Sequence, residues 1–290
     1  MTETSTPDLA GLVLVDKPAG MTSHDAVAIV RRALKTRRVG HTGTLDPFAT
    51  GLLVVLVGRG TRLIPYVDGE PKVYEAVIRF GAETDTDDLT GEVVREAAPP
   101  SDTAVAAAIE RLTGEIDQIP PAYSAKKVDG VRAYDAARRG SALELAPSRV
   151  SVQAWTLQGR AGSDLRVRIT CGGGTYIRAL ARDLGRSSQS AAHLAELRRL
   201  KSGPFDVGDA TPIEAIRTGH VSVRPLLTGV ASLPAQRLET ADLRRALHGN
   251  SVAARVSGPR VALLDDQETL IAVADRVGDD LHPALVLRDA

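Results

Sequence analysis

Alternating hydrophobic and polar positions predict strands and a helix within the first eighty residues. An apolar run at 12–15 predicts a short strand. Apolar residues at helical spacing predict a helix for which Thr22 and Ser23 are the candidate caps. A loop rich in Gly and Thr occupies 40–51 and leads into the apolar run LLVVLV at 52–57, which predicts a buried strand. Residues 72–80 alternate, with Tyr74, Ala76, Ile78 and Phe80 on one face, which predicts a strand.

The same mixture continues through the middle of the chain. Ser101 is placed to cap a helix, and further strands are expected at 149–158 and 164–171. A triple glycine then leads into a helix that begins near Tyr176, and another helix is expected to run to about Leu200. Segments of both kinds therefore alternate without a long run of either.

The type of predicted element changes near Leu233-Pro234, which is the expected domain boundary. Short segments with β character follow at 260–265, 269–275 and 285–288, separated by turns, and they predict a small β-rich module. The fold class is α+β, a mixed body with antiparallel strands followed by a compact C-terminal β domain. The expected organisation is a flexible tail at 1–9, a body at 10–233 and a C-terminal domain at 235–290.

Composition narrows the class of protein. The chain has 290 residues, 43% hydrophobic and 25% charged, which is ordinary for a globular protein with a large core. Its single cysteine, Cys171, excludes an intramolecular disulfide and an all-cysteine metal site. No apolar run is long enough to span a bilayer, and the polar N-terminus does not resemble a signal peptide, so a cytoplasmic location is expected.

Charge is unevenly distributed although the formal net charge is zero. The segment 17–62 has eight Lys or Arg against two acids, and 160–201 has nine against three. Acidic stretches at 83–96 and 265–289 offset them, and 83–92 is expected to be an acidic loop. This asymmetry can create a cationic groove for phosphates, although an ordinary mixed surface explains the charge counts equally well.

The loop at 40–51 places an aspartate in a restrained setting. In GHTGTLDPFATG, two glycines permit a close approach by a ligand, and Pro47 forces Asp46 toward an extended conformation. A carboxylate held on a stiff loop can attack an electrophilic carbon or accept a proton. An Asp-Pro pair that merely starts a surface turn is the alternative interpretation of this local pattern.

Five further segments occur in order with this loop. They are LVLVDKPAGMTSHD upstream and, downstream, KVYEAVIRFG, IPPAYSAKKVDGVRAYDAARRG, CGGGTYIRALARDLG and HLAELRRLKSGPF. Together the six segments closely resemble the TruB family of bacterial tRNA pseudouridine synthases, densely over residues 10–205 and loosely in the C-terminal domain. Gly173 departs from the family pattern, since many relatives have a polar or basic residue there, and the acidic stretch 265–289 is unlike a strong RNA-binding platform.

The resemblance implies a pseudouridine synthase fold, with a mixed, largely antiparallel sheet flanked by helices and a small PUA-like C-terminal domain. It also implies isomerisation of the T-loop uridine at position 55 of tRNA, after the base is flipped out of its stack. An insertion at about 120–148 would fold over the T arm. A tRNA-binding or tRNA-folding module with secondary catalysis, and a pseudouridylase dependent on a guide RNA, are the alternatives.

The resemblance assigns catalytic roles to three residues. Asp46 is the expected nucleophile, and whether it attacks C6 of the base or acts at the ribose stays open. Arg178 is the arginine expected to pair with that aspartate, as a guanidinium can do bidentately. Tyr74 is expected to stack on the flipped base, and its place on the alternating strand also suits a core tyrosine.

Other residues of the matching segments are expected to bind substrate. Tyr176 matches a second pocket tyrosine, and His41 matches the histidine that enters the RNA loop as the base leaves. Leu197 matches an apolar wall residue, with ordinary helix packing as the equal alternative. Lys17 is assigned a structural role, as a support of the catalytic loop.

No cofactor and no metal are expected, since no other His, Cys or carboxylate lies at ligand spacing around His41. The expected partner is the T arm of tRNA, bound by a monomer that requires no protein partner and no membrane. Basic side chains are the candidates for phosphate contacts, and they are Arg31, Arg32, Lys35, Arg37, Arg38, Lys126, Lys127, Arg132, Arg198, Arg199 and Lys201.

Overall fold

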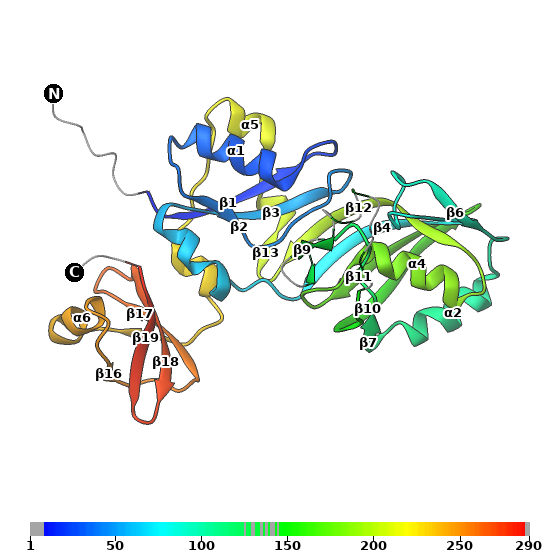
Figure 1. The fold of residues 1–290 in the computed structure, drawn as a ribbon. Helices are drawn as coiled ribbons and strands as arrows, with labels where there is room; N and C mark the ends of the chain where they lie inside the picture. Colours follow the sequence, from blue (N-terminus) through cyan, green and yellow to red (C-terminus); the bar gives the residue numbers. More distant parts are fainter. Residues whose placement is uncertain are drawn as a thin grey trace. The chain divides into compact units, whose positions relative to one another are not determined.

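The structure is a computed structural model that describes residues 9–124, 126–128, 131–133, 136, 139, 143 and 145–287. Most of the predicted tail at 1–9 and parts of the predicted insertion at 120–148 lie outside these residues. The chain forms two compact units, of which the first combines residues 1–69 with 204–290 and the second comprises 70–203 (Figure 1). The predicted domain boundary near residue 233 stays a prediction.

The first unit is built around two long strands. They are β1 (Gly11–Lys17) and β3 (Thr50–Val57), which pair antiparallel over their full lengths. Around them lie β2 (Val39–His41), β13 (Phe205–Asp206), β14 (Thr211–Pro212), α1 (Ser23–Ala33), α5 (Ile213–Arg217) and the 3-10 helices η1 (Gly58–Tyr66), η2 (Val207–Asp209) and η3 (Leu226–Val230). The β2 strand pairs antiparallel with β3, and β14 pairs parallel with β1.

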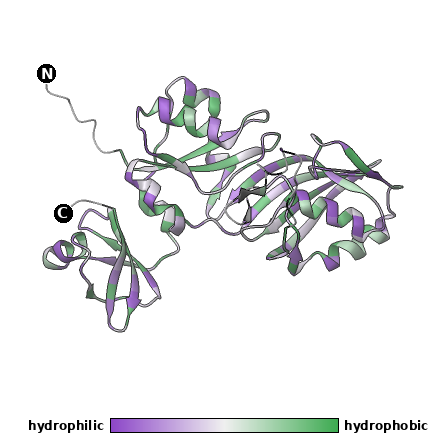
Figure 2. Ribbon diagram, in the orientation of Figure 1, coloured by the Kyte–Doolittle hydropathy of each residue, from purple (hydrophilic) through white to green (hydrophobic). Residues whose placement is uncertain are grey.

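Both faces of the β1–β3 pair are buried, which explains why the run LLVVLV is apolar throughout. Side chains such as Leu12, Leu52 and Val54 belong to a core shared with η1, η3 and the C-terminal strands. The alternate side chains, such as Val13 and Val55, pack with α1 and α5. Both α1 and α4 (Ile177–Ser187) have hydrophobic and hydrophilic residues along their length (Figure 2).

The C-terminal part of this unit is β-rich, as the sequence predicts. Its sheet has the order β15-β17-β18-β19-β16. The bounds are β15 (Ala235–Arg237), β16 (Val252–Ala253), β17 (Arg260–Leu264), β18 (Leu270–Val277) and β19 (Asp280–Val286), with one helix, α6 (Thr240–Leu247), that the pattern did not predict.

The second unit contains an antiparallel sheet with the order β12-β4-β11-β10-β7. Its strands are β4 (Lys72–Phe80), β7 (Gly114–Gln118), β10 (Ser148–Ala161), β11 (Asp164–Cys171) and β12 (Ala192–Ser202). The smaller elements are β5 (Ala82–Thr84), β6 (Val93–Glu96), β8 (Lys127–Val128), β9 (Val131–Arg132) and α2 (Asp102–Arg111), which the hydroxyl of Ser101 caps as predicted.

The helix predicted to run to about Leu200 is wrong, because this segment is the strand β12. Its residues are good helix formers in isolation, but β12 pairs with β4 along nearly its whole length, and packing in a sheet overrides intrinsic propensity. Leu197 therefore lies on a strand opposite Ala76, and the alternative of ordinary helix packing does not apply.

Candidate active site

The backbone around Asp46 is held by the Ser23 side chain and by the backbone of Gly20. Ser23, at the start of α1, accepts a hydrogen bond from the Leu45 N–H at 2.9 Å and donates one to the Leu45 carbonyl at 3.1 Å. On the other side of Asp46, the Pro47 carbonyl accepts from the Gly20 N–H at 2.8 Å. The carboxylate of Asp46 therefore extends from a backbone that is fixed on both sides.

Lys17 supports the Asp46 loop, the structural role expected for it. Its side chain is fully buried, and its Nζ donates to the carbonyls of Pro18 at 2.9 Å, Met21 at 2.7 Å and Pro47 at 3.5 Å. A buried ammonium requires such acceptors to offset its lost hydration. One side chain thus connects the end of β1 to both the Gly20 turn and the Asp46 loop.

His41 ends β2 and is half-buried, next to the same loop. Its ring meets the His24 ring edge-on, with centroids 5.9 Å apart and an interplanar angle of 88°. Helix α1 that carries His24 begins with a capping box between Thr22 and Asp25, as predicted for Thr22. Among the described residues, no group of three His, Cys, Asp or Glu side chains could hold a metal ion.

In the second unit, Tyr74 and Leu197 share one face of the sheet. Tyr74 on β4 is opposite Ile169 of β11 and Arg199 of β12, while Leu197 is opposite Ala76. Directly opposed residues project to the same face, and side chains two positions apart on a strand do so too. The predicted strand is confirmed, and Tyr74, Ala76, Ile78 and Phe80 on its one face are all buried, as is Val77 on the other face.

Tyr176 and Arg178 lie at the beginning of α4. Tyr176 is the N-cap residue, and its backbone is held by Gln118 through two hydrogen bonds. Arg178 is 5% exposed and donates to the carbonyls of Thr86 and Tyr123, each at 2.9 Å, with Asp88 at 3.6 Å. The guanidinium is therefore tightly positioned, and its pairing with Asp46 stays a prediction.

Arg178 is the first of three arginines spaced one turn apart on α4, and each meets an acid of the segment 83–88. Arg178 pairs with Asp88, Arg182 with Asp87 at 2.8 Å, and Arg186 with Glu83. The acidic loop expected at 83–92 is thus wrong in part, since the three acids are buried and the segment begins in β5. Three acids of the segment 83–96 and three arginines of the segment 160–201 therefore neutralise one another within the protein.

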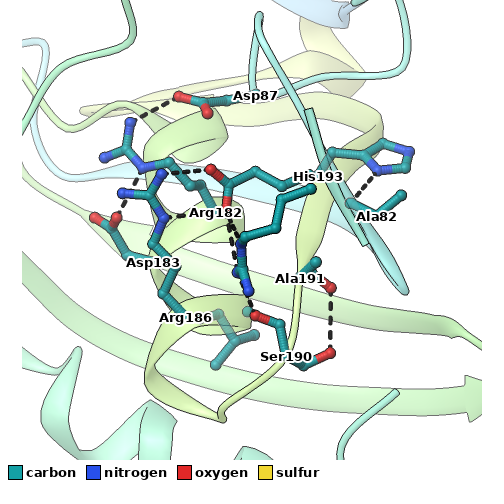
Figure 3. A network of polar contacts seen from close by, with 12 residues as sticks. Ala82, Asp87, Arg182, Asp183, Arg186, Ser190, Ala191 and His193 are labelled. Atoms are coloured by element: carbon teal, nitrogen blue, oxygen red, sulfur yellow. Dashed lines mark hydrogen bonds and ion pairs between the residues drawn. The ribbon is translucent and has the colours of Figure 1, made fainter. Parts of the chain in front are cut away.

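Arg182 is the middle member of this arginine ladder, formed by Arg178, Arg182 and Arg186, and its side chain is buried (Figure 3). Its Nη1 donates to Asp87, its Nε to Asp183 at 2.9 Å, and its Nη2 to the Ile119 carbonyl at 2.8 Å. Burial raises the pKa of Asp87 to about 6, against the opposing charges of Arg182 and Arg178. Burial likewise raises the pKa of Asp183. Such a costly set of buried charges implies that the position of α4 is strongly specified.

Glu83 holds the far end of the ladder. Its carboxylate accepts from Arg186 Nε at 3.0 Å and from Arg95 Nη2 at 3.2 Å. Burial alone would raise the pKa of Glu83, but the hydrogen bonds and charges of these two arginines outweigh it and lower the pKa. None of the ladder residues Glu83, Asp87, Asp88, Arg182 and Arg186 was predicted as a site residue, although the spacing RALARDLGR was a usable signal for one helical face.

The candidate phosphate contacts differ in accessibility. Arg31, Arg32, Lys35, Arg37 and Arg38 are exposed, and none has a carboxylate partner among the described residues. Arg199 is 2% exposed, so it lies within the protein opposite Tyr74 rather than on the surface.

The remaining candidates are less accessible or less defined. Arg198 is half-buried and Lys201 is exposed, both on β12. Lys126 donates to Ser148, whereas the side chains of Lys127 and Arg132 lie outside what the structure describes.

Comparison with known proteins decides the family. The family described as "TruB family pseudouridylate synthase (N terminal domain)" matches residues 31–177. A protein of Thermobifida fusca named tRNA pseudouridine synthase B is 44% identical over 287 residues, 95% of this chain and 98% of the relative. The chain belongs to the TruB family. A TruB relative of the same name from Corynebacterium glutamicum (strain R) is also 44% identical, over 90% of this chain and 94% of the relative.

Solved structures confirm the fold. A protein chain from an H/ACA ribonucleoprotein bound to a substrate RNA matches with a TM-score of 0.73 at 20% identity. The match covers 98% of this chain and 91% of the chain in that structure. A Cbf5-Nop10-Gar1 complex gives a TM-score of 0.72 at 22% identity, covering 96% and 85%. The pseudouridine synthase fold, with a C-terminal sheet consistent with a PUA-like domain, is therefore the fold of this TruB chain. No helix in the described residues is long and apolar enough to cross a membrane.

Proposed function

We propose that this TruB chain is a tRNA pseudouridine synthase that isomerises the T-loop uridine at position 55, with Asp46 as its nucleophile. The observation that carries the proposal is the fixed backbone on both sides of Asp46, held by Ser23 and by Gly20 and Lys17. A carboxylate that need not be reorganised before it attacks is what nucleophilic catalysis requires. The names of relatives at 44% identity support tRNA as the substrate.

The reaction requires that the uridine leave its stack, because the C1′–N1 bond must break and C1′–C5 must form. In this proposal Tyr74 stacks on the extruded base and Tyr176 and Leu197 complete the pocket wall. His41 occupies the space that the base leaves in the RNA loop, and Arg178 pairs with Asp46. Arg199, buried opposite Tyr74, joins this pocket instead of contacting a phosphate.

The RNA backbone is bound by exposed cations. This part of the proposal rests on the five exposed basic residues of the segment 31–38, which are Arg31, Arg32, Lys35, Arg37 and Arg38. The insertion at 120–148 folds over the T arm, and residues 235–290 extend the contact as a PUA-like domain. The chain acts in the cytoplasm as a monomer, without a guide RNA, protein partner, cofactor or metal. Because each neutralised phosphate releases counterions, tRNA affinity falls steeply with salt, and Arg31→Ala lowers the slope of log K against log salt by about one.

The test is to incubate an unmodified tRNA transcript with the purified chain and to map pseudouridine by reverse transcription after carbodiimide treatment. We expect one modified position, the T-loop uridine, and none in a transcript with cytidine there. Light scattering of the active sample should give the mass of one chain. RNA binding without any pseudouridine would contradict the proposal and favour the tRNA-binding module, and a requirement for a guide RNA would contradict the stand-alone form.

A further inference from the structure

Gln118, the last residue of β7, has a buried side-chain amide that hydrogen-bonds to the backbone of one other residue. It is 1% exposed. Its Nε2 donates to the Tyr176 carbonyl at 3.1 Å, and its Oε1 accepts from the Tyr176 N–H at 2.8 Å. A buried amide left without partners is costly, so these two bonds strongly favour one relative position of Gln118 and Tyr176.

Tyr176 has little else to fix its backbone. It follows the glycines 172–174, of which Gly174 has a positive φ of 77° that other residues rarely adopt. Its own side chain does not cap α4. Among the described residues, Gln118 and Leu180 are the residues that hydrogen-bond to it, and the Leu180 bond is the first turn of the helix.

The chain that follows Gln118 lies along the first half of α4. The Ile119 carbonyl accepts from Arg182 at 2.8 Å, and the Tyr123 carbonyl accepts from Arg178 at 2.9 Å. Pro120 and Pro121 stiffen the stretch between these contacts. Residues 118–123 therefore form a clamp on the helix that carries both Tyr176 and Arg178, directly before the segment 126–148.

We infer that Gln118 is a positioning residue of the uridine pocket, one that sets the place of the Tyr176 ring through the Tyr176 backbone. The inference rests on the proposed function, in which Tyr176 contacts the flipped base. Gln118 itself touches no reacting atom. Its loss is expected to slow the chemical step and to leave tRNA affinity nearly unchanged, because exposed cations elsewhere bind the RNA backbone.

The chain offers a matched control in Gln236. This buried glutamine also bridges backbone, donating to the Ala253 carbonyl at 2.8 Å and accepting from the Arg255 N–H at 2.7 Å, but it lies in the C-terminal sheet. Gln118→Met and Gln236→Met each remove one hydrogen bond donated to a backbone carbonyl and one accepted from a backbone N–H, and both keep a similar side-chain volume. Comparable losses of melting temperature are therefore expected for the two variants.

The experiment compares single-turnover pseudouridine formation and tRNA affinity for the two variants and the wild type. For Gln118→Met we expect a rate loss of at least about tenfold, since displacement of a pocket group by about 1 Å can cost about a hundredfold. For Gln236→Met we expect the wild-type rate. Rates within about twofold of the wild type for a folded Gln118→Met would overturn the inference.

Gln118→Glu provides a second, independent readout. Its carboxyl group can donate to the Tyr176 carbonyl only when protonated, and as a carboxylate it repels that oxygen. The ratio of variant to wild-type rate should therefore rise as the pH falls from about 8 to about 5, and a ratio independent of pH contradicts the inference. Absence of pseudouridine with the wild type would instead refute the proposed function, so the two failures are distinguishable.

Discussion

The Ser23 hydroxyl is the most specific support of the Asp46 loop, and Ser23→Ala removes it with little change in volume. Ser23 is 1% exposed and Leu45 is 4% exposed, so water cannot easily replace the lost hydroxyl. The variant leaves the Leu45 N–H and carbonyl without their serine partner, at 2.9 and 3.1 Å in the wild type. These groups adjoin the peptide that carries Asp46.

The size of the effect follows from the two hydrogen bonds. A typical net contribution is about 0.5–1.5 kcal/mol per bond, and a buried group left unsatisfied costs about 1–3 kcal/mol. We therefore expect Ser23→Ala to lower the free energy of unfolding by about 2–3 kcal/mol. A loop that relaxes also moves the Asp46 carboxylate, so the single-turnover rate should fall by about tenfold or more.

Urea unfolding and single-turnover pseudouridine formation measure the two effects separately. Ser101→Ala is the control, because it removes the cap of α2 in the other unit and should cost about 1 kcal/mol without changing the rate. A Ser23→Ala variant that loses stability but keeps the wild-type rate would refute the argument that the loop is preorganised by Ser23.

Three further predictions concern the arginine ladder and the buried thiol. Arg182→Met leaves Asp87 buried without its main partner and should cost about 3–5 kcal/mol in urea unfolding, whereas Arg255→Met, which breaks an exposed pair, should cost under about 1 kcal/mol. The pKa of Glu83 is lowered from 4.5, so its stabilising contribution is present above about pH 4.5 and is lost as the pH falls through the folded-state pKa; Glu83→Gln should flatten the acid limb of stability against pH. Burial raises the pKa of Cys171 to about 11, so a disulfide reagent at neutral pH should modify it only in urea, and rapid reaction of the folded protein would contradict its burial.

The sequence predicted best those features that depend on local pattern. Three such features are confirmed: the strand with buried Tyr74, the cap at Thr22 and the turn from β11 into α4 through three glycines. They could be predicted because each is determined by neighbours within a few residues. The strand β12 was mistaken for a helix because only its pairing with β4, more than a hundred residues earlier, distinguishes the two.

Features that depend on distant contacts were not predictable in the same way. The pairing of Asp87 with Arg182 joins residues 95 positions apart, and no local pattern identifies 83–88 as buried. Gln118 gave no signal at all, since its role depends on its two bonds to Tyr176, 58 positions away. The resemblance to the TruB family pointed to the candidate site residues, but it did not point to the side chains that hydrogen-bond to them and hold them in place.

The most direct test of the account is pseudouridine formation by Asp46→Asn. The change keeps the shape of the side chain and removes its negative charge, so the nucleophile is lost while the loop held by Ser23 and Lys17 remains. We expect no pseudouridine at position 55 after prolonged single-turnover incubation, with tRNA affinity within about threefold of the wild type. Pseudouridine formed by Asp46→Asn at a rate comparable to the wild type would contradict this expectation.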